Sequence, residues 1–254
     1  MITGIDYGWV GLAALVAGIV NAIAGGGTLI TFPMMIAIGI PPVVANVTNS
    51  VALCPGYVGG TLAQWRDLRG QSSRIIWLVP IGILGGTVGG LLLMATDERV
   101  FSAIVPYLIL LACALLALQD PLKRWLNRRL EQHAARSLNE RWAMLPIGLS
   151  AVYGGYFGAG LGVIMLATLG ITLDDTLVRL NALKQLLSLA INLAAALYFA
   201  WAAPVLWPVA GVMAIGALLG GALGGRLASH LKPATLRYAV VIIGFGVAFY
   251  YLTR

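Results

Sequence analysis

A lysine and several amide side chains interrupt an apolar stretch in the second half of the chain. The stretch reads "RLNALKQLLSLAIN" and covers residues 179–192. Its polar residues follow helical spacing and fall on one face, at positions i, i+3, i+4, i+7 and i+11: Asn181, Lys184, Gln185, Ser188 and Asn192. An ammonium group surrounded by amides and hydroxyls is suited to binding an anion.

A similar polar stripe lies in the first half of the chain. Asn46, Asn49, Ser50 and Tyr57 occupy positions i, i+3, i+4 and i+11 of another apolar segment. Small polar side chains also make hydrogen bonds between membrane helices without binding a substrate, and this alternative stays open for Ser188 and Asn192. Two equivalent stripes, one of which carries a cation, favour a shared central cavity to which Ser50 and Ser188 would add hydroxyl groups.

Consecutive glycines precede two short apolar segments. The motifs are "AGGGT" at 24–28 and "YFGAGLG" at 156–162, and the segments that follow, 28–40 and 161–172, are too short to cross a bilayer as helices. Lipid cannot satisfy exposed backbone N–H and C=O groups, so such interruptions indicate broken helices that line a transport site. The glycines expected in these breaks are Gly25, Gly26, Gly27, Gly158 and Gly160.

The acidic residues predict the charge of the expected cavity. All nine Asp and Glu residues fall in loops or at the ends of apolar segments, so Lys184 has no acidic partner within a span. An unpaired ammonium in the bilayer costs at least about 2.5 kcal/mol, and a bound anion would offset that cost. The N-terminal ends of broken helices add partial positive charge. The predicted substrate is therefore a small anion. Alternatively, the stem of Lys184 reaches the cytoplasmic interface, because Arg179 is only about 7.5 Å of helix rise away.

The composition places these residues in a membrane protein. The chain is 60% hydrophobic and only 10% charged, which excludes an ordinary soluble domain. The apolar segments, about ten in number, are 7–24, 28–40, 43–63, 74–95, 100–118, 143–158, 161–172, 177–200, 204–225 and 236–253. We therefore expect an all-α polytopic membrane protein. Because the segments hold no convergent acid–base, nucleophilic or metal-binding set, neither an enzyme nor a metal site is expected.

The chain repeats itself at one offset. Shifting it by 135 positions lays "LGGTVGG" at 84–90 over "LGGALGG" at 219–225, with five of seven residues identical, and lays Asn49 over Lys184. Glycine pairs at this spacing are typical of close helix packing. Each half would hold five segments, and because five is odd the second half enters the membrane from the opposite side, as an inverted-topology repeat. The expected repeats are 1–118 and 143–254.

Basic residues gather in three loops and predict the orientation. The loops lie at 64–74, in a linker between the repeats at 119–142, and at 226–237. With ten segments all three fall on one side, which the positive-inside rule makes cytoplasmic, and both termini then lie outside. The linker could bind lipid headgroups or nucleic acid, but a solvated cytoplasmic linker is the simpler interpretation, and no nucleic-acid partner is expected. The expected location is the plasma, or inner, membrane.

The same residues resemble a known family. The pattern "NAIAGGGTLITFPMMIAIGIPPVVANVTNSVAL" at 21–53, with "GGYFGAGLGVIMLATLGI" and "LNALKQLLSLAINLAAALYF" in the second half, is similar to the sulfite exporter TauE/SafE family, also called the toluene-sulfonate uptake permeases. The resemblance covers essentially the whole chain. It implies a polytopic carrier that moves sulfite, sulfonates or related anions across the plasma membrane. It also implies that the anion contacts the following residues: Asn46, Thr48, Asn49, Asn181, Lys184 and Gln185.

Several modes of transport agree with the sequence. Because no carboxylate or histidine is expected within the spans, a proton relay has no carrier in the protein. Facilitated diffusion, a proton carried on the substrate, and Na⁺ held near the glycine breaks all remain. We prefer an exporter or permease that works by alternating access, with one repeat rocking against the other. An anion channel and a non-transporting partner subunit are the alternatives. No cofactor is expected, and the sequence leaves a homodimer open.

Overall fold

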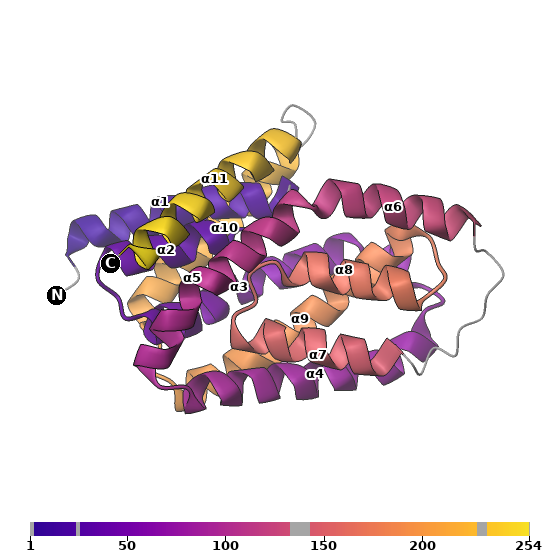
Figure 1. The fold of residues 1–254 in the computed structure, drawn as a ribbon, viewed down its shortest axis with the longest axis horizontal. Coiled ribbons are helices and arrows are strands. Elements are labelled where there is room, and N and C mark those ends of the chain that lie inside the picture. The colour runs from indigo at the N-terminus through magenta and orange to yellow at the C-terminus, as the bar shows by residue number, and fades with distance from the viewer. Residues whose placement is uncertain (1–2, 24–25, 133–142, 228–232, 254) are drawn as a thin grey trace.

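The protein is built from helices alone over the residues that its computed structural model describes, which are 3–23, 26–132, 143–227 and 233–253 (Figure 1). The helices in chain order are α1 (Gly4–Ile23), α2 (Thr28–Ala37), α3 (Pro42–Ala63), the 3-10 helix η1 (Trp65–Leu68), α4 (Ser72–Ala95), α5 (Glu98–Ala117), α6 (Gln119–Gln132), α7 (Met144–Tyr156), α8 (Leu161–Thr172), α9 (Leu177–Ala202), α10 (Trp207–Leu227) and α11 (Pro233–Leu252). The predicted all-α class is confirmed.

Six helices of the described ranges are long and apolar enough to cross a membrane, namely α1, α4, α5, α9, α10 and α11. Large apolar side chains cover their outward faces. Trp201, Ile242 and Phe249, for example, are 87%, 71% and 69% exposed. An apolar surface of this extent is stable where lipid rather than water covers it. The chain is therefore a multi-pass membrane protein, as the composition predicts.

Two short helices turn back on their predecessors as hairpins. Helices α2 and α8 have 10 and 12 residues, and they pack against α1 and α7 respectively. At the hairpin tips the backbone φ angle is +93° at Gly26, +75° at Gly158 and +78° at Gly160, in the left-handed region that favours glycine. The predicted breaks are thus present. Gly25 lies outside the described residues.

The helices recur at the offset of 135 residues found in the sequence. The starts of α3 and α9, of α4 and α10, and of α5 and α11 all obey it: Pro42 and Leu177, Ser72 and Trp207, and Glu98 and Pro233. Helices α1 to α5 thus correspond in order to α7 to α11, and α6 has no counterpart. The opposite orientation of the two sets in the membrane stays a prediction, as do the repeat boundaries.

The two sets of five helices are interlocked (Figure 1). Helix α1 packs along α10 and α4 along α7, so each of these pairs joins one helix from either set, while α3 and α9 pack against each other. Glycine makes both contacts close. A Cβ atom on Gly89 of α4 would collide with the carbonyl oxygen of Val152, and one on Gly220 of α10 with that of Leu15. The packing role predicted for the glycine pairs is confirmed at these positions.

The first part of the expected linker is a packed helix. In α6, Leu126 is fully buried and lies against Gly170 of α8, where a Cβ atom would collide with the leucine side chain. Arg124 and Arg128 on the other side of α6 are exposed. Residues 119–132 therefore belong to the helical body, and residues 133–142 lie outside the described ranges.

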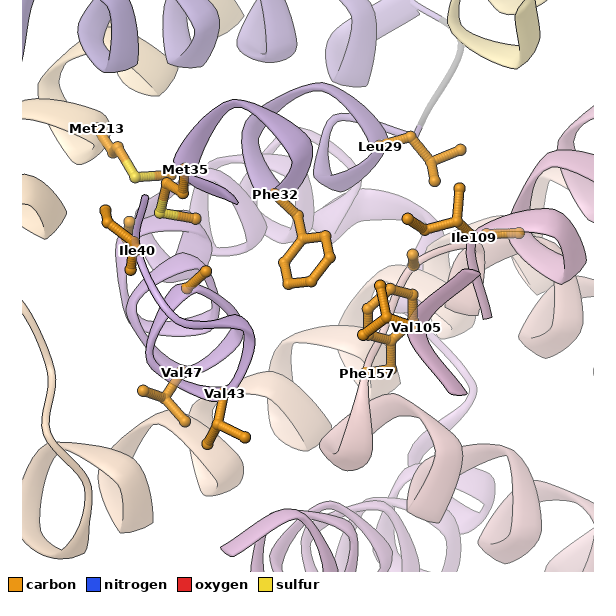
Figure 2. Close-up of a cluster of buried hydrophobic side chains, with 14 of the residues drawn as sticks. Leu29, Phe32, Met35, Ile40, Val43, Val47, Val105, Ile109, Phe157 and Met213 are labelled. Atoms are coloured by element: carbon orange, nitrogen blue, oxygen red, sulfur yellow. The ribbon is translucent and has the colours of Figure 1, made fainter. Parts of the chain in front are cut away.

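Aromatic side chains fill the space directly beyond the hairpin tips. Phe32 of α2 and Phe157 of the second tip meet edge to face, with ring centroids 5.4 Å apart, and Phe101 of α5 lies 6.4 Å from Phe157. Figure 2 shows Phe32 and Phe157 within the larger apolar core, to which Val105 and Ile109 also belong. We call Phe32, Phe101 and Phe157 the aromatic plug.

Candidate functional site

A cavity of about 240 Å³ lies where the tips of the two hairpins approach each other. Its wall combines both tips with the second half of α3, the first half of α9 and the junction of α5 and α6. The polar side chains in this wall are Asn21, Thr28, Tyr57, Gln64, Gln119, Lys123, Asn181, Lys184, Gln185 and Ser188. Among the described residues, the lining includes two lysines and no carboxylate.

The cavity gathers the predicted residues of α9 and of the hairpin tips. The predicted residues that line it are Asn181, Lys184, Gln185, Ser188, Gly26, Gly27, Gly158 and Gly160. Residues from both halves of the chain thus meet at one site. The stripe of α9 reaches it because residues at helical spacing share one face.

Lys184 lies over the N-terminal end of α8. Its Nζ and Cδ atoms are 3.9 Å from the point where a side chain on Gly162 would begin, so the glycine leaves room for the ammonium group. The N-terminus of a helix carries partial positive charge, which is an unfavourable neighbour for a cation. The ion pairs of the described residues join other groups, and none includes Lys184. The lysine therefore faces the cavity as an uncompensated cation.

Lys123 of α6 supplies a second cation, which the sequence analysis missed. Burial lowers the pKa of this lysine, as does the nearby charge of Arg237, while Asp120 acts in the opposite direction. Asp120 itself forms an ion pair with the buried Arg237 of α11. We assigned Lys123 to a solvated linker. Its spacing from Gln119 and Leu126, which gives one helical face, could have indicated otherwise.

Amide and hydroxyl groups complete the wall. The side chain of Asn181 donates a hydrogen bond from Nδ2 to Oε1 of Gln64 at 2.7 Å, which ties α9 to the end of α3. Ser188 Oγ and Gln119 Oε1 are buried and have no hydrogen-bond partner among the described residues. A ligand in the cavity could satisfy the hydroxyl of Ser188, because a hydroxyl can donate to an oxyanion.

The predicted polar residues near the start of α3 lie elsewhere. Asn46 donates from Nδ2 to the carbonyl oxygen of Tyr156 at 2.8 Å. Thr48 Oγ1 accepts the backbone N–H of Leu206 at 3.1 Å, and Asn49 Oδ1 accepts the hydroxyl of Thr31 at 2.6 Å. Ser50 is also absent from the cavity wall, and its hydroxyl donates to the carbonyl of Asn46. Asn46, Thr48 and Asn49 thus tie α3 to other segments, whereas the bond of Ser50 stays within α3.

The cavity lies toward one end of α3, α5 and α9. Along α3, α5 and α9 the cavity-lining residues lie at 56–64, 116 and 181–188, while Phe101 of the plug and the bonds of Asn46 and Thr48 lie nearer the other ends of α5 and α3. Basic residues of the 64–74 loop and of α6 lie at the cavity end. The cavity is thus on the side that carries these basic residues, and packed apolar side chains close the far side.

The sequence of this helical protein matches a known family over almost its whole length. The model of the family described as "Sulfite exporter TauE/SafE" matches residues 10–251. The chain belongs to the sulfite exporter TauE/SafE family. This TauE/SafE protein is therefore a membrane transporter and not an enzyme.

Curated relatives carry transporter names. A probable membrane transporter protein of Haemophilus influenzae is 32% identical over 231 residues, which cover 91% of this chain and 88% of that protein. The probable membrane transporter protein YfcA of Escherichia coli is 26% identical, and ORF9 of a Sinorhizobium species is 28% identical. Those alignments cover 96% and 93% of this chain and 88% of each relative. No solved structure matches the TauE/SafE chain.

An ion-pair cluster braces the cavity end of the TauE/SafE protein. Asp175, in the loop between α8 and α9, accepts hydrogen bonds from Arg74 and, at 2.8 Å, from Nε of Arg179. Burial acts to raise the pKa of the Asp175 carboxyl, but the hydrogen bonds from Arg179, the backbone of Thr176 and Arg74 outweigh it and hold the pKa below its usual value. The cluster fixes the start of α9, and with it the helix that carries Lys184.

Proposed function

We propose that this TauE/SafE protein carries a small sulfur-containing anion, such as sulfite or an organosulfonate, across the plasma membrane, and that the anion binds in the cavity beneath Lys184. One observation carries the proposal. The Lys184 ammonium lies against the N-terminus of α8 in a cavity whose described lining holds no carboxylate. The family name supports the sulfur-containing class.

The energetics of Lys184 favour an anionic ligand. An ammonium group without a partner in a membrane helix costs about 2.5–3.5 kcal/mol, and the adjacent helix end adds to that cost. An anion bound between Lys184 and the N-terminus of α8 would attract both the ammonium group and the partial positive charge of the helix end. The repulsion between these two groups would then be offset. The cavity has the volume of roughly eight water molecules, which accommodates an anion of a few heavy atoms with residual water.

The closed far side favours a carrier over an open channel. The aromatic plug belongs to the packed apolar core, and Phe101 lies near the start of α5, at the opposite end of this helix from the cavity-lining Leu116. Under the predicted orientation, this conformation has its cavity on the cytoplasmic side. Alternating access then requires the plug to separate while the contacts near Gln64 and Asn181 close.

The interlocked packing suggests which parts move. We predicted that one repeat rocks against the other, but α1 packs along α10 and α4 along α7, so a whole repeat could move only by breaking both glycine contacts. We infer instead that the pairs α1–α10 and α4–α7 each move as one body. The described lining has no carboxylate or imidazole, which favours an anion moving down its gradient or with a proton that it carries itself.

Binding and flux measurements on the purified protein test the proposal. Sulfite, sulfate, sulfonates and carboxylates are screened for thermal stabilisation, because a ligand that binds the folded state raises its apparent stability. We expect stabilisation by at least one sulfur oxyanion and its loss in Lys184→Gln. Arg99→Gln is the matched control, because Arg99 is an exposed cation at the start of α5, far from the cavity lining.

Flux in proteoliposomes then separates the modes of action. Saturable uptake that is stimulated by anion on the other side of the membrane supports a carrier, whereas large single-channel currents would identify a channel. If no anion stabilises the protein, or if Lys184→Gln responds like the parent, Lys184 does not hold the substrate.

A further inference from the structure

Helix α6 directs a lysine into the cavity from outside the two sets of five helices. Gln119 and Lys123 both line the cavity, and Leu126, on the same helical face, is fully buried against Gly170. The packing of Leu126 fixes the rotation of α6 about its axis. Lys123 is therefore held facing the cavity rather than the solvent.

The charge of Lys123 is not cancelled within the described part of the chain. The nearest acidic residue on α6, Asp120, forms its ion pair with Arg237, a buried side chain of α11 that is 4% exposed. No ion pair of the described residues includes Lys123. Lys123 is also close enough to Lys184 for the two positive charges to repel each other. The Asp120–Arg237 pair thus anchors α6, while Asp120 attracts Lys123 without forming an ion pair with it and neither cavity lysine has an ion-pair partner among the described residues.

We propose that Lys123 is a second anion-binding residue and that it makes the site prefer a doubly charged oxyanion over a singly charged one of the same shape. This inference rests on the proposed function, because it assumes that an anion occupies the cavity. It adds the charge of the preferred anion and a residue that determines it.

The number of charges in the cavity supports this preference. A monoanion can neutralise one ammonium group and leaves the other repelled by its neighbour. A dianion of the same size compensates both, and the second charge-assisted hydrogen bond is worth about a tenfold change in affinity or more. Lys184 lies on a helix that has a counterpart in the first half, where Asn49 occupies the equivalent position. Lys123 lies on the one described α-helix without a counterpart.

Sulfate and methanesulfonate provide the test, because both are tetrahedral sulfur oxyanions of similar size and differ by one charge. The dissociation constants of both anions are measured on the purified full chain. Four proteins are compared: the parent, Lys123→Gln, Lys123→Arg and the control Arg124→Gln, which removes a cation from the exposed side of the same helix. The temperature of unfolding is recorded for each, and Lys123→Met replaces Lys123→Gln if the latter does not fold.

We expect the parent to bind sulfate about tenfold more tightly than methanesulfonate or better. Lys123→Gln should lose most of that preference through weaker sulfate binding, whereas Lys123→Arg and Arg124→Gln should retain it. Equal binding of both anions by the parent, or an unchanged preference in Lys123→Gln, overturns the inference while the proposed function stands. Equal weakening of both anions by Lys123→Gln also overturns it. If the parent binds neither anion nor any other anion of the screen, the proposed function fails as well.

Discussion

Replacing Lys184 with methionine should stabilise the anion-free protein while it abolishes anion binding. Methionine has a similar volume and no charge, so the substitution removes the ammonium group from the N-terminus of α8 and from the neighbourhood of Lys123. A residue kept for binding at the expense of stability is typical of functional sites. Lys184→Arg, which keeps the charge, is the matched control.

The size of the effect follows from the surroundings of Lys184. A lysine at the centre of a membrane helix costs about 2.5–3.5 kcal/mol, but Lys184 is only partly buried and its cavity admits water, so about 1–2 kcal/mol should be recovered. For a protein of this length, 1 kcal/mol shifts the midpoint of thermal unfolding by about 2–4 °C. We therefore expect the midpoint to rise by about 2–8 °C.

Thermal unfolding in detergent, in a buffer free of small oxyanions, measures this shift. The same samples are then titrated with the anion that stabilises the parent, and Lys184→Met should show no further rise. If Lys184→Met lowers the midpoint of the anion-free protein, the ammonium group has a stabilising partner. Lys184 would then not be an uncompensated cation.

Three further substitutions test the packing, the plug and the ion-pair cluster. Gly89→Ala should destabilise the protein by about 1–3 kcal/mol, because its Cβ atom would meet the carbonyl oxygen of Val152, whereas Gly211→Ala, with open space around it, should be tolerated in the same thermal assay. Phe157→Leu removes an edge-to-face contact worth about 1 kcal/mol and should raise the passive leak of anions through proteoliposomes. If the variant leaks no more than the parent, the aromatic plug is not the barrier to anions. Asp175→Asn should cost about 1–2 kcal/mol at pH 7. Because the folded pKa of this carboxyl is lowered, its stabilisation exists above the unfolded pKa of about 3.9 and disappears as the pH falls through the folded pKa, so parent and variant should converge once the pH is below the folded pKa.

The features that the sequence predicted well are those that local composition determines. The two short apolar segments and their glycine breaks follow from length and from the conformational range of glycine, and α8 has the predicted bounds of 161–172. Helical spacing alone also puts Asn181, Lys184, Gln185 and Ser188 on the face of α9 that lines the cavity, while their role in binding stays a prediction.

The features that the sequence could not predict depend on tertiary contacts. Asn46 and Asn49 form the same pattern as the stripe on α9, yet their side chains bond to Tyr156 and Thr31 instead of lining the cavity. Periodicity identifies a polar face but not the partner that it meets. Lys123 was not predicted as a cavity residue because it lies in a segment rich in basic residues. A basic segment reads as a solvated linker unless the burial of Leu126 against α8 is known.

The crossed pairing of α1 with α10 and of α4 with α7 has a consequence for biosynthesis. The glycine-lined face of α1 has no partner until α10, which begins at Trp207, has been translated, so α1 waits in the bilayer through the insertion of most of the chain. The first half expressed alone would leave the contact faces of both α1 and α4 uncovered. Two copies of such a half could cover the faces of α1 and α4 by packing these helices against each other across the two copies, as in a swapped dimer. The fold is therefore completed late, when the last pair of helices enters the membrane.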